Sequence, residues 1–177
     1  MNRFNTRDLT AIALCAASWG VLNSIFAPLF FRLTGLPILC DFTGFSILTL
    51  GAWWIRKTGA ITIIGLIATV INFIFNPAGF QFLGFTAASI LFDASIGLAG
   101  YGAIFKKNTL TIISIMSIST LSAALAGYLI GAFLMIGPWG GGLGWASLHA
   151  AGGIIGGAIG VFMVISLTSR KIIPFTS

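Results

Sequence analysis

The chain has only three acidic residues and one histidine, and these side chains are the best suited to binding or proton chemistry in an otherwise apolar sequence. Asp93 lies near the centre of the apolar stretch TAASILFDASIGLAGYGAIF, residues 86–105. A carboxylate in hydrocarbon costs upward of about 2.5 kcal/mol, and the acids found there usually mark functional sites. We therefore expect Asp93 to contact a ligand, with a purely structural hydrogen bond between helices as the alternative.

Other polar and aromatic side chains at the ends of apolar runs complete a predicted binding site. In the alternative interpretation Asp41 is a helix cap, the asparagines join helices, and the tryptophans belong to an interfacial belt. Carboxylates, amides, an imidazole and indole rings together suit a small, flat, neutral or cationic molecule with amino groups. The predicted site comprises Asp41, Asn72, Asn76, Gln81, Asp93, Trp139, Trp145 and His149.

The composition excludes a soluble domain. Hydrophobic residues make up 58% of the 177 residues and charged residues only 7%, whereas soluble domains carry about 25% charged residues. The positive charges form no patch with interleaved aromatic residues, so we expect no nucleic-acid partner. The chain is predicted to be one all-α integral membrane domain over residues 1–177.

The elements that must hold the site are helices of bilayer length, about 17 to 25 residues. Six apolar segments qualify, and threading them across a bilayer puts all of the nine Lys and Arg residues except Arg32 on one side. Because short loops rich in Lys and Arg face the cytoplasm, both termini are predicted to be cytoplasmic. The predicted six-helix bundle consists of residues 8–27, 39–55, 58–75, 82–105, 109–135 and 146–168.

In this topology the predicted site residues fall in the outer half of the bilayer or near its midplane. The outer connections, at 28–38, 76–81 and 137–145, are also richer in Pro, Gly and aromatic residues than the inner ones. A conducting pore would place polar groups through the whole thickness of the membrane. The pattern instead favours a cavity that opens to the outside and is closed below.

The sequence contains no HExxH, GxSxG or Walker A motif, and neither cysteine has a CxxC neighbour. We therefore expect no catalysis, no ATP hydrolysis, and no bound metal or cofactor. Small residues four apart let helices approach closely, which makes Ala13 and Ala17 a candidate docking surface for a partner. The glycines of residues 146–168 are expected to pack inside the bundle.

Residues 52–95, AWWIRKTGAITIIGLIATVINFIFNPAGFQFLGFTAASILFDAS, resemble one branch of the S components, the substrate-binding membrane subunits of energy-coupling factor (ECF) vitamin transporters. This is the hydroxymethylpyrimidine and thiamine branch, in which an IRK-x-G-A turn, a helix ending in NP and an acidic fourth helix recur. Where that branch carries glutamates, this chain has Asp41 and Asn72. Biotin, pantothenate or a queuosine precursor therefore stay open as other ligands.

The resemblance implies high-affinity binding of a vitamin or vitamin precursor from outside the plasma membrane. It also implies docking through Ala13 and Ala17 onto a transmembrane coupling subunit that two cytoplasmic ATPases drive. Two other classes remain open. One is an accessory subunit of a membrane complex, whose polar residues only join helices. The other is a small autonomous transporter that uses Asp93 as a proton carrier.

Overall fold

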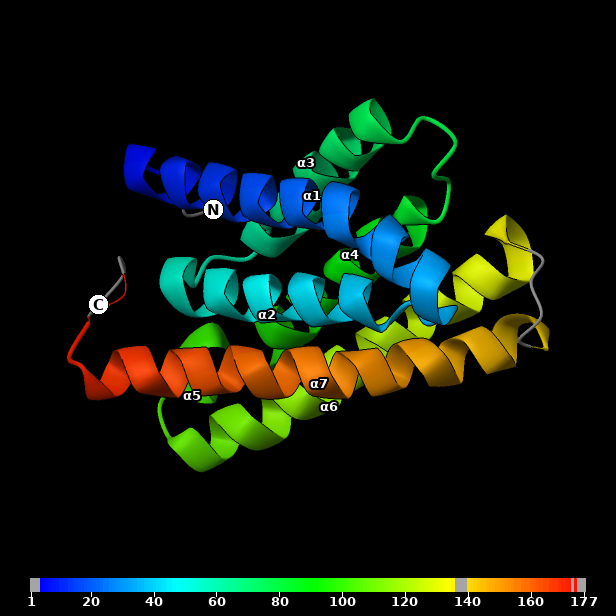
Figure 1. Ribbon diagram of the computed structural model, residues 1–177. Coiled ribbons are helices and arrows are strands. Elements are labelled where there is room, and N and C mark those ends of the chain that lie inside the picture. Colours follow the sequence, from blue (N-terminus) through cyan, green and yellow to red (C-terminus); the bar gives the residue numbers. More distant parts are fainter. Residues whose placement is uncertain (1–3, 136–139, 173, 175–177) are drawn as a thin grey trace.

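Helices connected by short turns make up the computed structural model, which describes residues 4–135, 140–172 and 174 (Figure 1). The elements are α1 (Thr6–Thr34), α2 (Ile38–Ile55), α3 (Ala60–Phe75), α4 (Phe82–Ala99), the short α5 (Tyr101–Ile104), α6 (Asn108–Leu129), the π-helical turn η1 (Ile130–Leu134) and α7 (Gly141–Ser169).

Among the described residues, five helices are long and apolar enough to cross a membrane: α1, α2, α4, α6 with η1, and α7. Helix α3 is equally apolar but has only 16 residues. Large apolar side chains point away from the bundle, and Leu98 and Phe162 are 91% and 71% exposed. An apolar exterior on helices of this length is typical of a multi-pass membrane protein, so the predicted all-α membrane bundle is confirmed at this level.

The two ends of the bundle differ in chemistry. One end, called the basic end below, holds the start of α1 and the end of α7, together with Arg56, Lys57, Lys106, Lys107, Arg170 and Lys171 (left in Figure 1). The opposite end, called the cavity end, holds the α1–α2 and α3–α4 connections and the start of α7. Residues of the cavity end are therefore about one helix length away from the paired cations.

Two predicted helix boundaries were wrong because a glycine ends each helix at a different place from the one predicted. Helix α1 continues through Pro28 as far as Thr34, and it ends where Gly35 adopts a left-handed conformation (φ 72°) and donates its N–H to the Phe31 carbonyl. This is a common glycine C-cap. The segment predicted as one helix over 82–105 is interrupted at Gly100 (φ 88°), which separates α4 from α5.

Helix α7 packs against α2 on one side and against α6 on the other through its glycines. A Cβ on Gly156 would lie 2.6 Å from the Asp41 carbonyl oxygen, and one on Gly153 would lie 2.5 Å from the Ala123 Cβ. Both distances are shorter than any real Cβ contact, so these backbones touch only because the side chains are missing. The expected internal packing of the glycines is confirmed.

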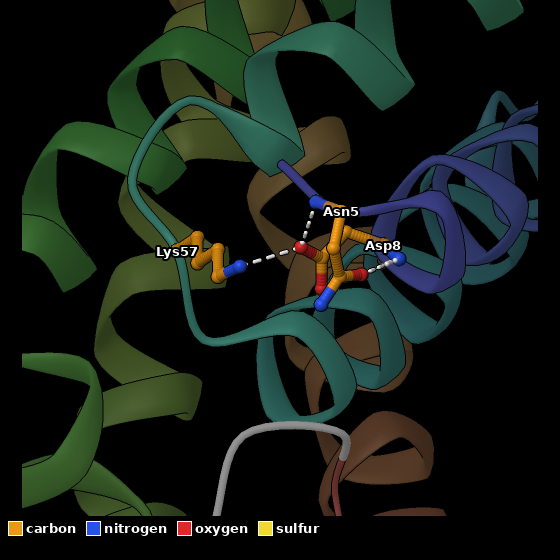
Figure 2. Close-up of polar contacts among 3 residues, drawn as sticks. All are labelled: Asn5, Asp8 and Lys57. Atoms are coloured by element: carbon orange, nitrogen blue, oxygen red, sulfur yellow. Dashed lines mark hydrogen bonds and ion pairs between the residues drawn. The ribbon is translucent and has the colours of Figure 1, made fainter. Parts of the chain in front are cut away.

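A polar cluster at the basic end joins the start of α1 to the α2–α3 connection, as Figure 2 shows. Asn5 and Asp8 form a reciprocal capping box, in which each side chain accepts a backbone N–H from the other residue at 2.8 Å. The buried Asp8 carboxylate also pairs with the Lys57 ammonium, 2.5 Å away. The capping box satisfies free N–H groups of the first helical turn, and the ion pair holds the α2–α3 connection against it.

Asp93 organises the same end of the bundle. Its Oδ2 atom accepts hydrogen bonds from the Gly59 N–H (2.8 Å), the Thr62 N–H (3.0 Å) and the Thr62 hydroxyl (2.9 Å), all at the start of α3. Its Oδ1 atom accepts the Tyr101 hydroxyl proton. Burial, reinforced by this hydrogen bond, raises the pKa of Tyr101, so the phenol stays a donor. Asp93 thus anchors α3 and α5 to α4 by capping the N-terminal turn of α3 from another helix.

We predict that Asp93→Asn lowers the free energy of unfolding by about 1–3 kcal/mol, because the amide would face at least one buried donor with its own NH₂ group. Reversible unfolding in mixed micelles measures this change. Thr62→Val, which removes a single hydroxyl donor, is the control and should have a smaller effect. Unchanged stability together with lost ligand binding in Asp93→Asn would contradict the capping role.

Candidate functional site

A cavity of about 170 Å³ lies at the cavity end, between the last turns of α1, the first turns of α2, α4 and α7, and η1. For comparison, an engineered apolar cavity of about 150 Å³ in another protein binds benzene. The space therefore fits one ring with a few substituents. Apolar and aromatic side chains form most of the wall, and the polar side chains in it are Arg32, Cys40, Gln81 and His149.

A buried acid–imidazole pair joins α2 to α7 beside this cavity. His149 Nδ1 lies 2.9 Å from both carboxylate oxygens of Asp41, and its hydrogen bond is to Oδ1. Asp41 is fully buried and His149 is 2% exposed. His149 is a lining residue of the cavity, whereas Asp41 lies behind it. A carboxylate in this position fixes the orientation of the ring and leaves Nε2 as the nitrogen without a partner among the described residues.

Three glycines make room for this arrangement. A Cβ on Gly152 would lie 2.5 Å from Asp41 Oδ2, and one on Gly127 would lie 2.8 Å from the His149 side chain. A Cβ on Gly131 would lie 2.5 Å from the Trp145 ring. Helices α2, α6 and the turn η1 therefore approach α7 closely enough to bury both Trp145 and His149.

Two of the lining residues each carry a buried polar atom that has no hydrogen-bond partner in the described part of the chain: His149 Nε2 and Trp145 Nε1. Both residues line the cavity and are 2% exposed. An unsatisfied buried polar group costs about 1–3 kcal/mol, so each of these atoms calls for a partner that the described residues do not supply. The rings themselves form an aromatic wall: Trp145 stacks on Phe31 with 6.2 Å between centroids and lies 6.0 Å from His149.

The turn η1 extends the wall at the end of α6. Its backbone is π-helical over Ile130–Leu134, and the Met135 N–H returns to the Ile130 carbonyl at 2.7 Å. Ile130 and Met135 both line the cavity. Single π-helical turns inserted in α-helices occur frequently at functional sites, which agrees with the position of this one.

The structure brings together only part of the predicted site. Gln81, Trp145 and His149 line the cavity, and Asp41 supports His149 from behind. Trp139 lies outside the described residues.

The other predicted residues lie away from the cavity, and the Asn72 and Asp93 side chains have structural partners. Asn72 joins α3 to α1 by accepting hydrogen bonds from the Asn23 amide (2.9 Å) and the Ser24 hydroxyl (3.1 Å). Asn76 follows the last turn of α3 and does not line the cavity. Asp93 belongs to the basic end, because the first turn of α3 holds its carboxylate. The expectation that it forms the floor of the cavity does not agree with this placement.

Several cavity residues escaped the sequence analysis, including Phe31, Pro37, Cys40, Phe82, Phe85 and Met135. Most are apolar, and in a chain with 58% hydrophobic residues an apolar residue carries no distinguishing signal. Phe31 and Arg32 were assigned to a loop, although the continuation of α1 brings them to the cavity. In the sequence, their position close to the predicted end of the first helix was the signal that could have placed Phe31 and Arg32 near the site.

Comparisons with family models, curated proteins and solved structures find no match to this chain. The function of the chain is therefore inferred from the geometry of the cavity and from the sequence.

A double-mutant cycle should detect strong coupling between Asp41 and His149. Removing one partner of a buried pair typically costs about 3–5 kcal/mol, because the remaining polar group stays buried without its partner. Asp41→Ala and His149→Ala are each expected to lower the free energy of unfolding by an amount in that range, and the double variant by clearly less than the sum. Additive losses in micelle unfolding would show that the two groups do not interact.

Proposed function

We propose that this chain is the S component of an ECF transporter, a membrane subunit that binds a small ring-containing vitamin or vitamin precursor and takes part in its uptake. Hydroxymethylpyrimidine and thiamine-like compounds are the first candidates. The observation that carries the proposal is the ring-sized cavity, whose wall is largely apolar and aromatic and includes the stacked Phe31 and Trp145 rings and the His149 imidazole.

The orientation that we propose makes α3 a sixth crossing, with the basic end in the cytoplasm. Loops rich in Lys and Arg stay on the cytoplasmic side, and the opposite end of the bundle would then face outward. Under this topology both termini are cytoplasmic, and the cavity takes its ligand from outside the plasma membrane. The short α3 spans with a locally thinned bilayer or with flanking residues that reach the interface.

The surface of α1 supports the proposed coupling to a transporter complex. Ala13 and Ala17 are both exposed, so none of the helices that the structure describes covers them. Large apolar residues flank them, with Leu14 58% exposed. A strip of small residues between larger ones allows a second helix to approach closely in the membrane. The proposed partner on this strip is the transmembrane coupling subunit, with two cytoplasmic ATPases supplying the energy.

The alternative classes explain less of the geometry. A proton carrier must exchange its proton with the transport path, but four hydrogen bonds hold the Asp93 carboxylate against the start of α3 and Tyr101. An accessory subunit would account for Asp93 and Asn72, which do join helices. It would not account for a ring-sized cavity with an aromatic wall.

The first test is calorimetric titration of the purified chain with hydroxymethylpyrimidine, thiamine and a panel of other vitamins, combined with mass spectrometry of co-purified small molecules. We predict tight binding of one compound, and a loss of about tenfold or more in Trp145→Ala, because a stacked aromatic contact and a buried hydrogen bond are removed. Phe162→Ala, on the exposed face of the same helix, is the matched control. Absence of any ligand in both assays would favour an accessory subunit.

The docking surface has its own test. Ala13→Leu combined with Ala17→Leu should reduce co-purification with the coupling subunit and ATPases at least about tenfold, because bulky side chains prevent close helix approach. Ligand binding by the variant alone should be unchanged. Val70→Leu, on the exposed face of α3, is the control. Normal assembly of the double variant would place the docking surface elsewhere.

A further inference from the structure

A single arginine stands at the mouth of the cavity. Arg32, in the last turn of α1, is the one lysine or arginine among the described residues that line the cavity. It is also the one exposed residue among them, whereas the rest of the wall is buried or half-buried. The guanidinium group is therefore available to a substituent that projects outward from a ring bound in the cavity.

The chain offers Arg32 no carboxylate partner. Its three acids are Asp8, Asp41 and Asp93. Asp8 is ion-paired at the basic end, and Asp93 is hydrogen-bonded to the start of α3 at the same end. Asp41 lies at the cavity end, but it is fully buried and bonded to His149. Within the part of the chain that the structure describes, Arg32 accordingly forms no ion pair.

The start of α4 adds positive potential beside this arginine. Gln81 and Phe82 both line the cavity, and the first turn of the helix contains no acidic residue. Because a helix dipole is positive at its N-terminus, this end of α4 favours an anionic group nearby. The Gln81 amide is half-buried in the same wall and provides a further hydrogen-bond donor.

A simpler role for Arg32 is to neutralise the negative end of the α1 dipole, since it lies in the last turn of that helix. An arginine on any face of the turn would serve this purpose. The next residue, Leu33, is 76% exposed, and a cation there would act on the dipole without contacting the cavity. The dipole alone therefore does not explain why the cation lies on the face that lines the cavity.

Resting on the ligand-binding function proposed above, we propose that the cavity takes a ring compound with an anionic substituent, a carboxylate or a phosphate, and that Arg32 pairs with this group at the mouth. A guanidinium group binds either anion through two parallel N–H groups. At the exposed mouth the anion keeps part of its hydration, so its charge need not be buried. Among vitamins and vitamin precursors, those with an acid group are therefore favoured over the neutral or cationic molecules expected from the sequence.

Two fluorinated ring probes of nearly equal shape test this anion subsite. 4-Fluorobenzoate carries a carboxylate, and 4-fluorobenzamide is its neutral counterpart. Their saturable binding to the full-length chain in uncharged detergent is measured by ¹⁹F NMR. The benzoate should bind about fivefold more tightly, which is the upper range for an ion pair open to solvent.

Equal affinity for the two probes would overturn the anion subsite and leave the ring cavity itself in place. Saturable binding of neither probe would also overturn it. The titration with vitamins would then decide separately whether the chain binds any vitamin, so the two proposals can fail independently.

Three variants separate recognition from folding. Arg32→Gln should abolish the preference for the benzoate and leave the affinity for the benzamide unchanged, a combination that a folding defect would not produce. Arg32→Lys keeps the charge and should retain part of the preference. Arg170→Gln makes the same change of charge at the basic end and should behave like the wild type. An undiminished preference in Arg32→Gln would overturn the assignment of the anion contact to Arg32.

A lipid headgroup is the other source of a phosphate for an arginine at the end of a membrane helix. Repeating the two titrations in phosphatidylcholine nanodiscs distinguishes the two sources. The preference for the benzoate should persist there, because the subsite belongs to the cavity. A preference that is present in detergent but lost in nanodiscs would assign Arg32 to the lipid phosphates and overturn the proposal.

Discussion

A buried carboxylate bonded to a buried imidazole joins α2 to α7, and the arrangement of the cavity end depends on the space that this pair requires. Side chains at Gly127, Gly131 or Gly152 would collide with His149, Trp145 or Asp41. The glycines therefore allow α2, α6 and α7 to approach one another around polar groups instead of apolar side chains. This close approach brings Trp145 and His149 into the wall of the cavity.

The three acids of the chain illustrate how an apolar bundle accommodates carboxylates. Asp8 lies at a helix start and pairs with Lys57, and Asp93 receives N–H groups at the start of α3. Among the described residues, His149 is the one hydrogen-bond partner of the Asp41 carboxylate. The first two are stabilised by several donors at the basic end. Asp41 is the least stabilised, and it is also the one beside the cavity. Incomplete stabilisation of a buried acid is a common property of functional sites.

The membrane class, the apolar helices and the internal packing of the α7 glycines could be predicted because they depend on composition and on runs of similar residues. The end of the bundle at which Asp93 lies could not be predicted. Its position within an apolar segment does not show which neighbouring helix contacts its side chain. Its partners, Gly59 and Thr62, belong to a different helix, and Tyr101 follows a break at Gly100. The pairing of Asp41 with His149 likewise joins residues 108 positions apart.

The glycine-rich faces of α7 also bear on how this protein can vary. Gly152, Gly156 and Gly160 face α2, and Gly153 and Gly157 face α6. At these positions any side chain meets a neighbouring helix, whereas the α2 and α6 residues opposite them already contribute the bulk of each contact. In both interfaces, the α7 side therefore tolerates fewer substitutions than the α2 or α6 side. Natural variation should accumulate on the lipid-facing side of α7 and on its partners, and should leave a periodic pattern of invariant glycines along α7 itself.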